Sequence, residues 1–73
     1  MELKEVPIVS EMPGGYRRLG YFQDRETGRA ALFDYRGQRV WIPTSTLRFK
    51  GGKYWAPKWA IDSSRQFQQE QRG

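Results

Sequence analysis

Two short turn signals, Arg36–Gly37 and Gly51–Gly52, place the strongest limits on how this chain can fold. Each lies between segments in which apolar and polar residues alternate, which is the pattern of a half-buried strand. A DRETG loop at Asp24–Gly28 and a polar bend at Thr44–Thr46 separate further segments of similar length. The predicted strands are Tyr16–Gln23, Arg29–Tyr35, Gln38–Pro43, Leu47–Lys50 and Lys53–Ala56. This spacing favours a mainly β fold of about five strands, either a small barrel or a strongly curved antiparallel meander.

The turn at Gly51–Gly52 sets the register of the hairpin around it, because a two-residue loop allows one pairing. The predicted cross-strand pairs are Lys50 with Lys53, Phe49 with Tyr54, and Arg48 with Trp55. Side chains alternate between the two faces of a sheet, so the hairpin has an apolar face and a cationic face. The apolar face, expected to lie on the core, consists of Leu47, Phe49, Tyr54 and Ala56. The other face, which we call the cationic platform, consists of Arg48, Lys50, Lys53 and Trp55.

The turn at Arg36–Gly37 sets the register of a second hairpin in the same way. The predicted pairs are Asp34 with Arg39, Phe33 with Val40, Leu32 with Trp41, and Ala31 with Ile42. The core face of this hairpin consists of Ala31, Phe33, Val40 and Ile42. Leu32 and Trp41 form an apolar pair on the outer face, which either the N-terminal arm or a C-terminal helix should cover. On the first strand Tyr21 is expected to lie in the core, as apolar strand positions usually do.

Residues 1–15 are predicted to form an N-terminal arm ahead of a single small β-domain. The apolar residues Val6 and Ile8 can form a short edge strand or fill a groove, while Pro7 excludes a central strand. No linker or internal repeat divides residues 16–67, so we expect them to fold as one unit. A chain of about 60 residues buries only about 60% of its unfolded surface, and this one has no cysteine for a disulfide. The domain must therefore rely on a compact apolar core.

The C-terminal segment has three interpretations. Pro57 suits the first turn of a helix, which favours a short helix from there to about Phe67 and a disordered tail over residues 68–73. The alternatives are a strand that continues past Pro57, because large apolar residues alternate there, and a helix that begins later with Asp62 or Ser63 as its N-cap. Trp59 is expected to anchor the segment against the domain, with its indole N–H on a backbone partner.

Histidine and cysteine are both absent. Their absence removes the usual zinc ligands and the commonest acid–base and nucleophilic groups. No HExxH, GxSxG or P-loop motif occurs, so we predict that the protein is not an enzyme and has no cofactor or metal. The N-terminus lacks the pattern of a signal peptide, and no segment approaches the roughly 20 apolar residues of a membrane span. These features predict a cytoplasmic protein with no membrane partner.

The stretch Arg36–Ile61 has no acidic residue but carries all three tryptophans and six of the 13 basic residues. The net charge of +5 and a pI near 10.0 indicate an acidic partner, most often nucleic acid. Lys50 opposite Lys53 is unfavourable by itself, and a bound polyanion would supply the missing counter-charge. We therefore predict a non-enzymatic module that binds DNA or RNA with low sequence specificity. Its predicted site residues are Arg48, Lys50, Lys53 and Trp55, with Arg36, Arg39 and Lys58 at the margin.

Two other interpretations fit the same residues. The cations can simply keep an exposed hairpin soluble, as lysines often do at sheet edges. The alternative function is a protein-interaction adaptor, or a small regulator or inhibitor of a nucleic-acid-processing enzyme, that uses an aromatic groove or a sheet edge. Exposed rings within the basic surface would favour nucleic acid, whereas an apolar patch away from it would favour a protein partner. We expect a monomer or a weak homodimer.

The segments VWIPTSTL and YWAPKWA resemble those of short, mostly uncharacterised proteins of phages and other mobile elements. Those proteins share a small β-domain with a WIPxSxL-like strand and bend, and a PxWA-like segment near the C-terminus. The matching residues here are Trp41, Ile42, Pro43, Ser45, Leu47, Pro57, Trp59 and Ala60. The resemblance implies a small β-domain of mobile-element origin and carries no activity or functional residue. Strand number and length also resemble SH3-like and OB-like barrels, which is an analogy of fold alone.

Overall fold

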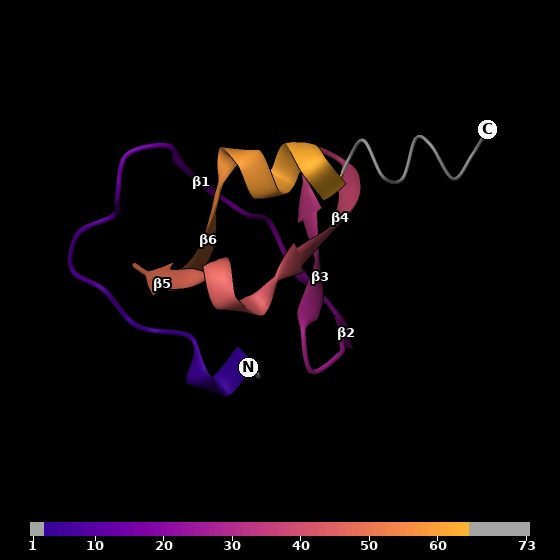
Figure 1. The fold of residues 1–73 in the computed structure, drawn as a ribbon, viewed down its shortest axis with the longest axis horizontal. Helices are drawn as coiled ribbons and strands as arrows, with labels where there is room; N and C mark the ends of the chain where they lie inside the picture. Colours follow the sequence, from indigo (N-terminus) through magenta and orange to yellow (C-terminus); the bar gives the residue numbers. More distant parts are fainter. Residues whose placement is uncertain (1–2, 65–73) are drawn as a thin grey trace.

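The computed structural model of the protein describes residues 3–64. The strands are β1 (Tyr16–Arg18), β2 (Phe22–Glu26), β3 (Ala30–Tyr35), β4 (Gln38–Pro43), β5 (Arg48–Lys50) and β6 (Lys53–Pro57). They form two three-stranded antiparallel sheets, with strand orders β1-β6-β5 and β2-β3-β4 (Figure 1). The remaining elements are the 3₁₀ helices η1 (Leu3–Glu5) and η2 (Thr44–Thr46) and an α-helix over residues 58–64. The prediction of a mainly β antiparallel fold is confirmed, but the described residues contain six strands, and the two sheets do not close into a barrel.

The segment predicted as one strand over residues 16–23 is two strands that belong to different sheets. Gly20 lies at the break, where its N–H donates a 2.7 Å hydrogen bond to the backbone carbonyl of Asp34. A Cβ at this position would lie 2.9 Å from that carbonyl oxygen, so only glycine lets the chain pass so close to β3. This close approach carries the chain from one sheet to the other.

The DRETG segment, predicted to be a loop, is mostly strand. β2 continues through Glu26, and the loop between β2 and β3 is limited to residues 27–29. Asp24 has a positive φ of 56°, and the β2–β3 register shifts between Phe22 and Glu26, as at a β-bulge. The Oγ1 of Thr27 closes the loop by accepting hydrogen bonds from the backbone N–H groups of Ala30 and Arg29, at 3.0 and 3.1 Å. The bulge accommodates polar residues that the sequence pattern assigned to a turn.

Both predicted hairpin registers are confirmed. The observed pairs include Asp34 with Arg39, Leu32 with Trp41, Arg48 with Trp55, and Lys50 with Lys53. Positive φ angles occur at both central positions of each turn, with 51° and 80° at Arg36–Gly37 and 61° and 77° at Gly51–Gly52. Two positive φ angles are the requirement of a type I′ turn, whose twist matches that of the flanking strands. Local turn geometry therefore sets which side chains share a face in each hairpin.

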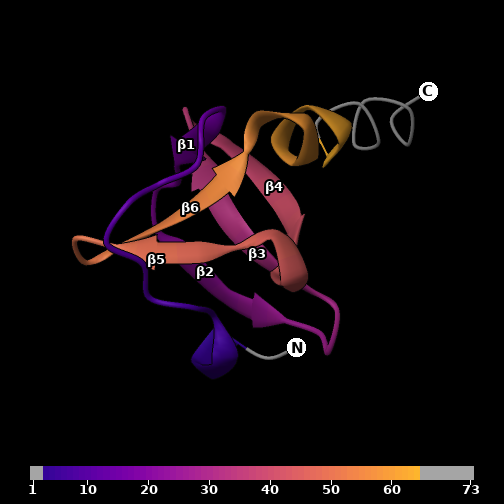
Figure 2. The same cartoon turned by 60° about the vertical axis from the view of Figure 1, so that its left-hand side comes forward.

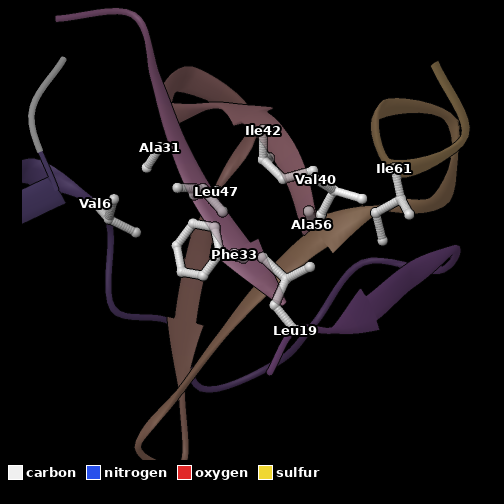
Figure 3. Close-up of a cluster of buried hydrophobic side chains, with 9 residues drawn as sticks. All are labelled: Val6, Leu19, Ala31, Phe33, Val40, Ile42, Leu47, Ala56 and Ile61. Atoms are coloured by element: carbon white, nitrogen blue, oxygen red, sulfur yellow. The ribbon is translucent and has the colours of Figure 1, made fainter. Parts of the chain in front are cut away.

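The core lies between the two sheets (Figure 3). Its fully buried strand residues include Ala31, Phe33, Val40, Ile42 and Ala56, each 0% exposed. The Phe33 ring lies 5.6 Å from the Phe22 ring and 5.2 Å from the Tyr54 ring, so it joins the two sheets. Val6 from the N-terminal arm and Ile61 from the C-terminal helix complete the cluster. The apolar faces predicted from the two registers are thus the faces that form the core.

The N-terminal arm runs along the free edge of β5 (Figure 2). The N–H of Phe49 donates to the carbonyl of Pro7 at 2.9 Å, and the N–H of Val9 donates to the carbonyl of Phe49 at 3.0 Å. Pro7 takes part through its carbonyl alone, which is the edge role that a proline can fill. Ile8 forms a single parallel bridge with Phe49 while its side chain stays 81% exposed. The arm therefore protects a sheet edge without becoming a full strand.

The C-terminal helix begins directly after Pro57, so the prediction of helix in place of a continuing strand is confirmed over residues 58–64. The rest of the predicted helix and the predicted tail lie outside the described residues. The buried residues of the helix are Ala60, Ile61 and Ser64. Ser64 follows Ile61 by three positions and Ala60 by four, so the three residues lie on one helical face. The Oγ of Ser64 accepts a 2.7 Å hydrogen bond from the backbone N–H of Trp41, so the helix packs beside β4.

Candidate nucleic-acid interface

The outer face of the β1-β6-β5 sheet presents a tryptophan between two arginines. Trp55 on the central strand β6 is the cross-strand partner of Arg18 on β1 and also of Arg48 on β5. Residues directly opposite one another in a sheet share a face, so the three side chains leave the sheet on the same side. We call this set, Arg18, Trp55 and Arg48, the arginine–tryptophan row. It lies on the face opposite to the buried Ala56.

Hydrogen bonds to the backbone hold two members of the row in place. The indole N–H of Trp55 donates to the carbonyl of Lys50 at 3.1 Å, which fixes the ring across the hairpin. The Nη1 of Arg48 donates to the carbonyls of Leu47 and Ser45, at 2.7 and 3.2 Å. Both side chains are half-buried, whereas Arg18 is exposed. The row is therefore ordered on two of its three strands before any ligand binds, which lowers the entropic cost of binding.

Lys50 and Lys53 occupy the tip of the hairpin, directly opposite each other as predicted. Both are exposed, and within residues 3–64 neither forms an ion pair. The Nζ of Lys53 lies 5.9 Å from the centroid of the Tyr21 ring, a cation–π contact. Tyr21 is 80% exposed, so its expected place in the core is wrong. The chain leaves the core at Gly20, and the next side chain therefore joins the basic surface.

A surface groove of about 460 Å³ lies beside the row at Arg48. Its wall includes Tyr16, Arg48, Lys58 and Trp59. Trp59 is 62% exposed, so its predicted role as a buried anchor is also wrong. The buried face of the helix is taken by Ala60 and Ile61, which turns Trp59 outward. The structure thus brings a second tryptophan to the cationic surface.

The three predicted margin residues have different surroundings. Lys58 forms a 2.7 Å ion pair with Asp62 one helical turn later, so its charge has an internal partner. Arg36 lies in the β3–β4 turn, with its guanidinium carbon 5.6 Å from the centroid of the Tyr35 ring. Arg39 lies on β4 on the outer face of the other sheet, because its strand neighbour Val40 points into the core. Arg39 is therefore not on the same face as the row.

Arg18 is the member of the row that sequence reasoning did not assign. Alternation along the first strand sends Arg17 and Arg18 to opposite faces, but only the pairing of β1 with β6 shows which one joins the platform. The sequence signal that could have placed Arg18 is the apolar residue after it, Leu19, which lies in the core and is 2% exposed. Because side chains alternate along a strand, a core position for Leu19 puts Arg18 on the outer face.

The described residues 3–64 contain no group of three or more His, Cys, Asp or Glu side chains suited to a metal ion. Within the same range no helix has the length and apolar character needed to cross a membrane. In comparisons with known proteins, no family model, no curated protein and no solved structure matches the chain. A functional conclusion for this protein therefore rests on the geometry of its surface.

Proposed function

We propose that this protein is a non-enzymatic module that binds nucleic acid with low sequence specificity through the outer face of its β1-β6-β5 sheet. The arginine–tryptophan row carries the proposal, because Trp55 has an arginine as cross-strand partner on both sides. Arginine binds phosphate as a planar fork, and tryptophan offers a flat apolar face to a base. Phosphate groups can thus contact Arg18 and Arg48 while a base packs on the ring between them.

The positions of the other exposed rings support the same function. Trp59 shares a groove with Arg48, and Tyr21 lies beside Lys53. Rings placed within a basic surface are expected of a protein that stacks bases and neutralises phosphates. Stacking contributes about 1–3 kcal/mol per base and does not depend on which base it is. This independence is the reason for proposing low sequence specificity.

The proposal is tested by fluorescence titration of the tryptophans with single-stranded and duplex oligonucleotides over a range of salt concentrations. The cations taken to contact phosphates are Arg18, Arg48, Lys50 and Lys53. Neutralising four phosphates predicts that log K falls with log salt at a slope of about −2.8 for a single strand or about −3.6 for a duplex. Absence of binding to both forms at low salt would contradict the proposal.

A protein-interaction adaptor is the second candidate, and one observation favours it. Ile8 is 81% exposed beside an apolar groove of about 220 Å³ that Phe49 and Tyr54 also line. Phe49 and Tyr54 lie on the opposite face of the hairpin from the row, so the two sites are separate. Photo-crosslinking in a cell extract from position 10, an exposed site on the same arm, tests this role. A protein adduct that Ile8→Ser abolishes supports it, and the absence of any adduct contradicts it.

A further inference from the structure

A second depression, of about 370 Å³, lies where β1 ends and the β3–β4 turn approaches it. Its lining residues are Arg17, Arg18, Leu19, Gly20, Tyr35 and Arg36. We propose that this depression binds a phosphate group of the nucleic acid, with the guanidinium groups of Arg18 and Arg36 as donors. The inference rests on the proposed function and assigns a phosphate subsite to it.

The position of Arg36 in its turn is the first argument. Arg36 has a φ of 51°, at the first central position of a type I′ turn, where Asn, Asp and Gly are preferred. The left-handed conformation is unfavourable for a residue with a long side chain, so turn formation does not explain an arginine here. Its guanidinium carbon lies 5.6 Å from the centroid of the Tyr35 ring, and both residues line the depression. A residue in a strained conformation at the wall of a surface depression points to a binding site.

The concentration of positive charge is the second argument. Three arginines contribute to the lining of one depression, and within residues 3–64 none of them has an ion-pair partner. The Nη1 of Arg17 donates a local hydrogen bond to the carbonyl of Tyr16 at 3.2 Å. Like charges repel one another, and the Asp34 carboxylate, which lies beside Gly20, forms no ion pair with these arginines within residues 3–64. A phosphate group relieves this repulsion and accepts the paired N–H donors that arginine presents.

The depression is continuous with the proposed interface through Arg18. This residue lines the depression and is also the cross-strand partner of Trp55. A strand whose base packs on Trp55 therefore has its neighbouring phosphate directed toward the depression. The same chemistry can come from an internal phosphodiester or from a phosphate at the end of a strand.

The substitution Arg36→Asn separates binding from folding, because asparagine is favoured in this turn while the guanidinium is lost. Arg29→Asn is the matched control, since Arg29 is an exposed arginine in the β2–β3 loop that does not line the depression. We expect Arg36→Asn to weaken binding of a single-stranded oligonucleotide by about fivefold or more, with Arg29→Asn within about twofold of the unchanged protein. The thermal unfolding temperature of Arg36→Asn should be unchanged or raised.

Oligonucleotides with a 5′-phosphate, a 3′-phosphate or no terminal phosphate distinguish an internal phosphodiester from a phosphate at the end of a strand. An equal loss of affinity for all three identifies an internal phosphodiester, and a loss confined to one end-phosphorylated form identifies a terminal phosphate. If the unchanged protein binds but Arg36→Asn and Arg29→Asn behave alike, the phosphate subsite is wrong and the proposed function stands. If the unchanged protein binds none of the oligonucleotides, the proposed function is wrong and the subsite with it.

Discussion

The two hairpins of this domain have the same turn geometry, but the residues on their outer faces differ. The β3–β4 and β5–β6 hairpins both close through two residues with positive φ and both turn an apolar face to the core. On the outer face of the first hairpin, Trp41 lies opposite Leu32, which is 5% exposed. On the outer face of the second, Trp55 lies opposite Arg48, and Arg18 flanks it on the other side. The tryptophan is common to both hairpins, and the cross-strand neighbours differ.

This difference shows which observations carry functional information in a small β-domain. Residues on the inner faces are explained by folding, because both hairpins need them for the same core. On the outer faces the two rings differ in their surroundings. Trp41 is 37% exposed and has a buried leucine as its cross-strand partner, whereas half-buried Trp55 has an arginine on each side. The cations beside Trp55 make it the candidate binding residue of the two.

The largest expected effect comes from the inner face that both hairpins share. Phe33→Ala removes a fully buried ring that contacts both sheets and should lower the free energy of unfolding by about 3–5 kcal/mol. At about 0.05–0.15 kcal/mol per residue a domain of this size has a stability of only about 4–11 kcal/mol, so much of it would be lost. Thermal unfolding followed by circular dichroism measures the change. Trp55→Ala is the comparison, and an equal loss of stability in the two variants would contradict the assignment of Trp55 to the outer face.

The comparison between the outer faces is sharpest in the two tryptophans. Trp55→Ala should weaken single-strand binding by about 1–3 kcal/mol, which is roughly 5-fold to 150-fold. Duplex binding should weaken less, because paired bases do not stack on the ring. Trp41→Ala should leave the affinity for both forms unchanged when fluorescence anisotropy is measured with labelled oligonucleotides. Equal effects of the two substitutions would remove the distinction between the hairpins.

A smaller effect is expected from the arginines of the two outer faces. Arg18→Gln removes one proposed phosphate contact and should make the salt dependence of single-strand binding shallower by about 0.7 in the slope of log K against log salt. Arg39→Gln removes the same charge from the outer face of β4 and should leave the slope unchanged. The slopes come from titrations at several salt concentrations. A slope that changes equally in both variants would show that only net charge matters.

The smallest expected effect concerns Lys58, whose ion pair with Asp62 is exposed to solvent. Asp62→Asn frees the lysine next to the groove that contains Trp59, and should raise nucleic-acid affinity by about twofold at low salt. Stability should fall by only about 0.2–0.5 kcal/mol, as is usual for an i,i+4 pair. The paired measurements are an oligonucleotide titration and a denaturant titration. An unchanged affinity in this variant would place Lys58 outside the interface.

Much of each hairpin can be predicted from sequence because its pairing is local. The glycines at Gly37 and Gly51–Gly52 set the register, and the register then sorts Phe33 and Trp55 to opposite kinds of face. These relationships depend on residues a few positions apart in the chain. Turn chemistry alone therefore gave the correct inner and outer faces of both hairpins.

The errors arise where the structure depends on contacts between distant segments. The close approach of Gly20 to Asp34 splits the first strand and turns Tyr21 out of the core, and no local pattern reports that approach. Arg18 joins the row only because β1 pairs with β6, far along the chain. The position predicted for Trp59 is wrong because packing against the sheets decides which face of the helix is buried. Ala60 and Ile61 lie on that face, so Trp59 points outward. The part of the candidate site within one hairpin could be predicted, and the parts supplied by β1 and the helix could not.

The most direct test uses the three tryptophans as separate reporters. In a ¹H–¹⁵N correlation spectrum each indole N–H gives its own signal, and a single-stranded oligonucleotide can be added stepwise at low salt. If the arginine–tryptophan row binds the strand, the signals of Trp55 and Trp59 will shift or broaden together with the backbone amides of β1, β5 and β6, while the signal of Trp41 stays in place. Shifts centred on Trp41 and the β3–β4 hairpin, or no shifts at any concentration, would contradict this prediction.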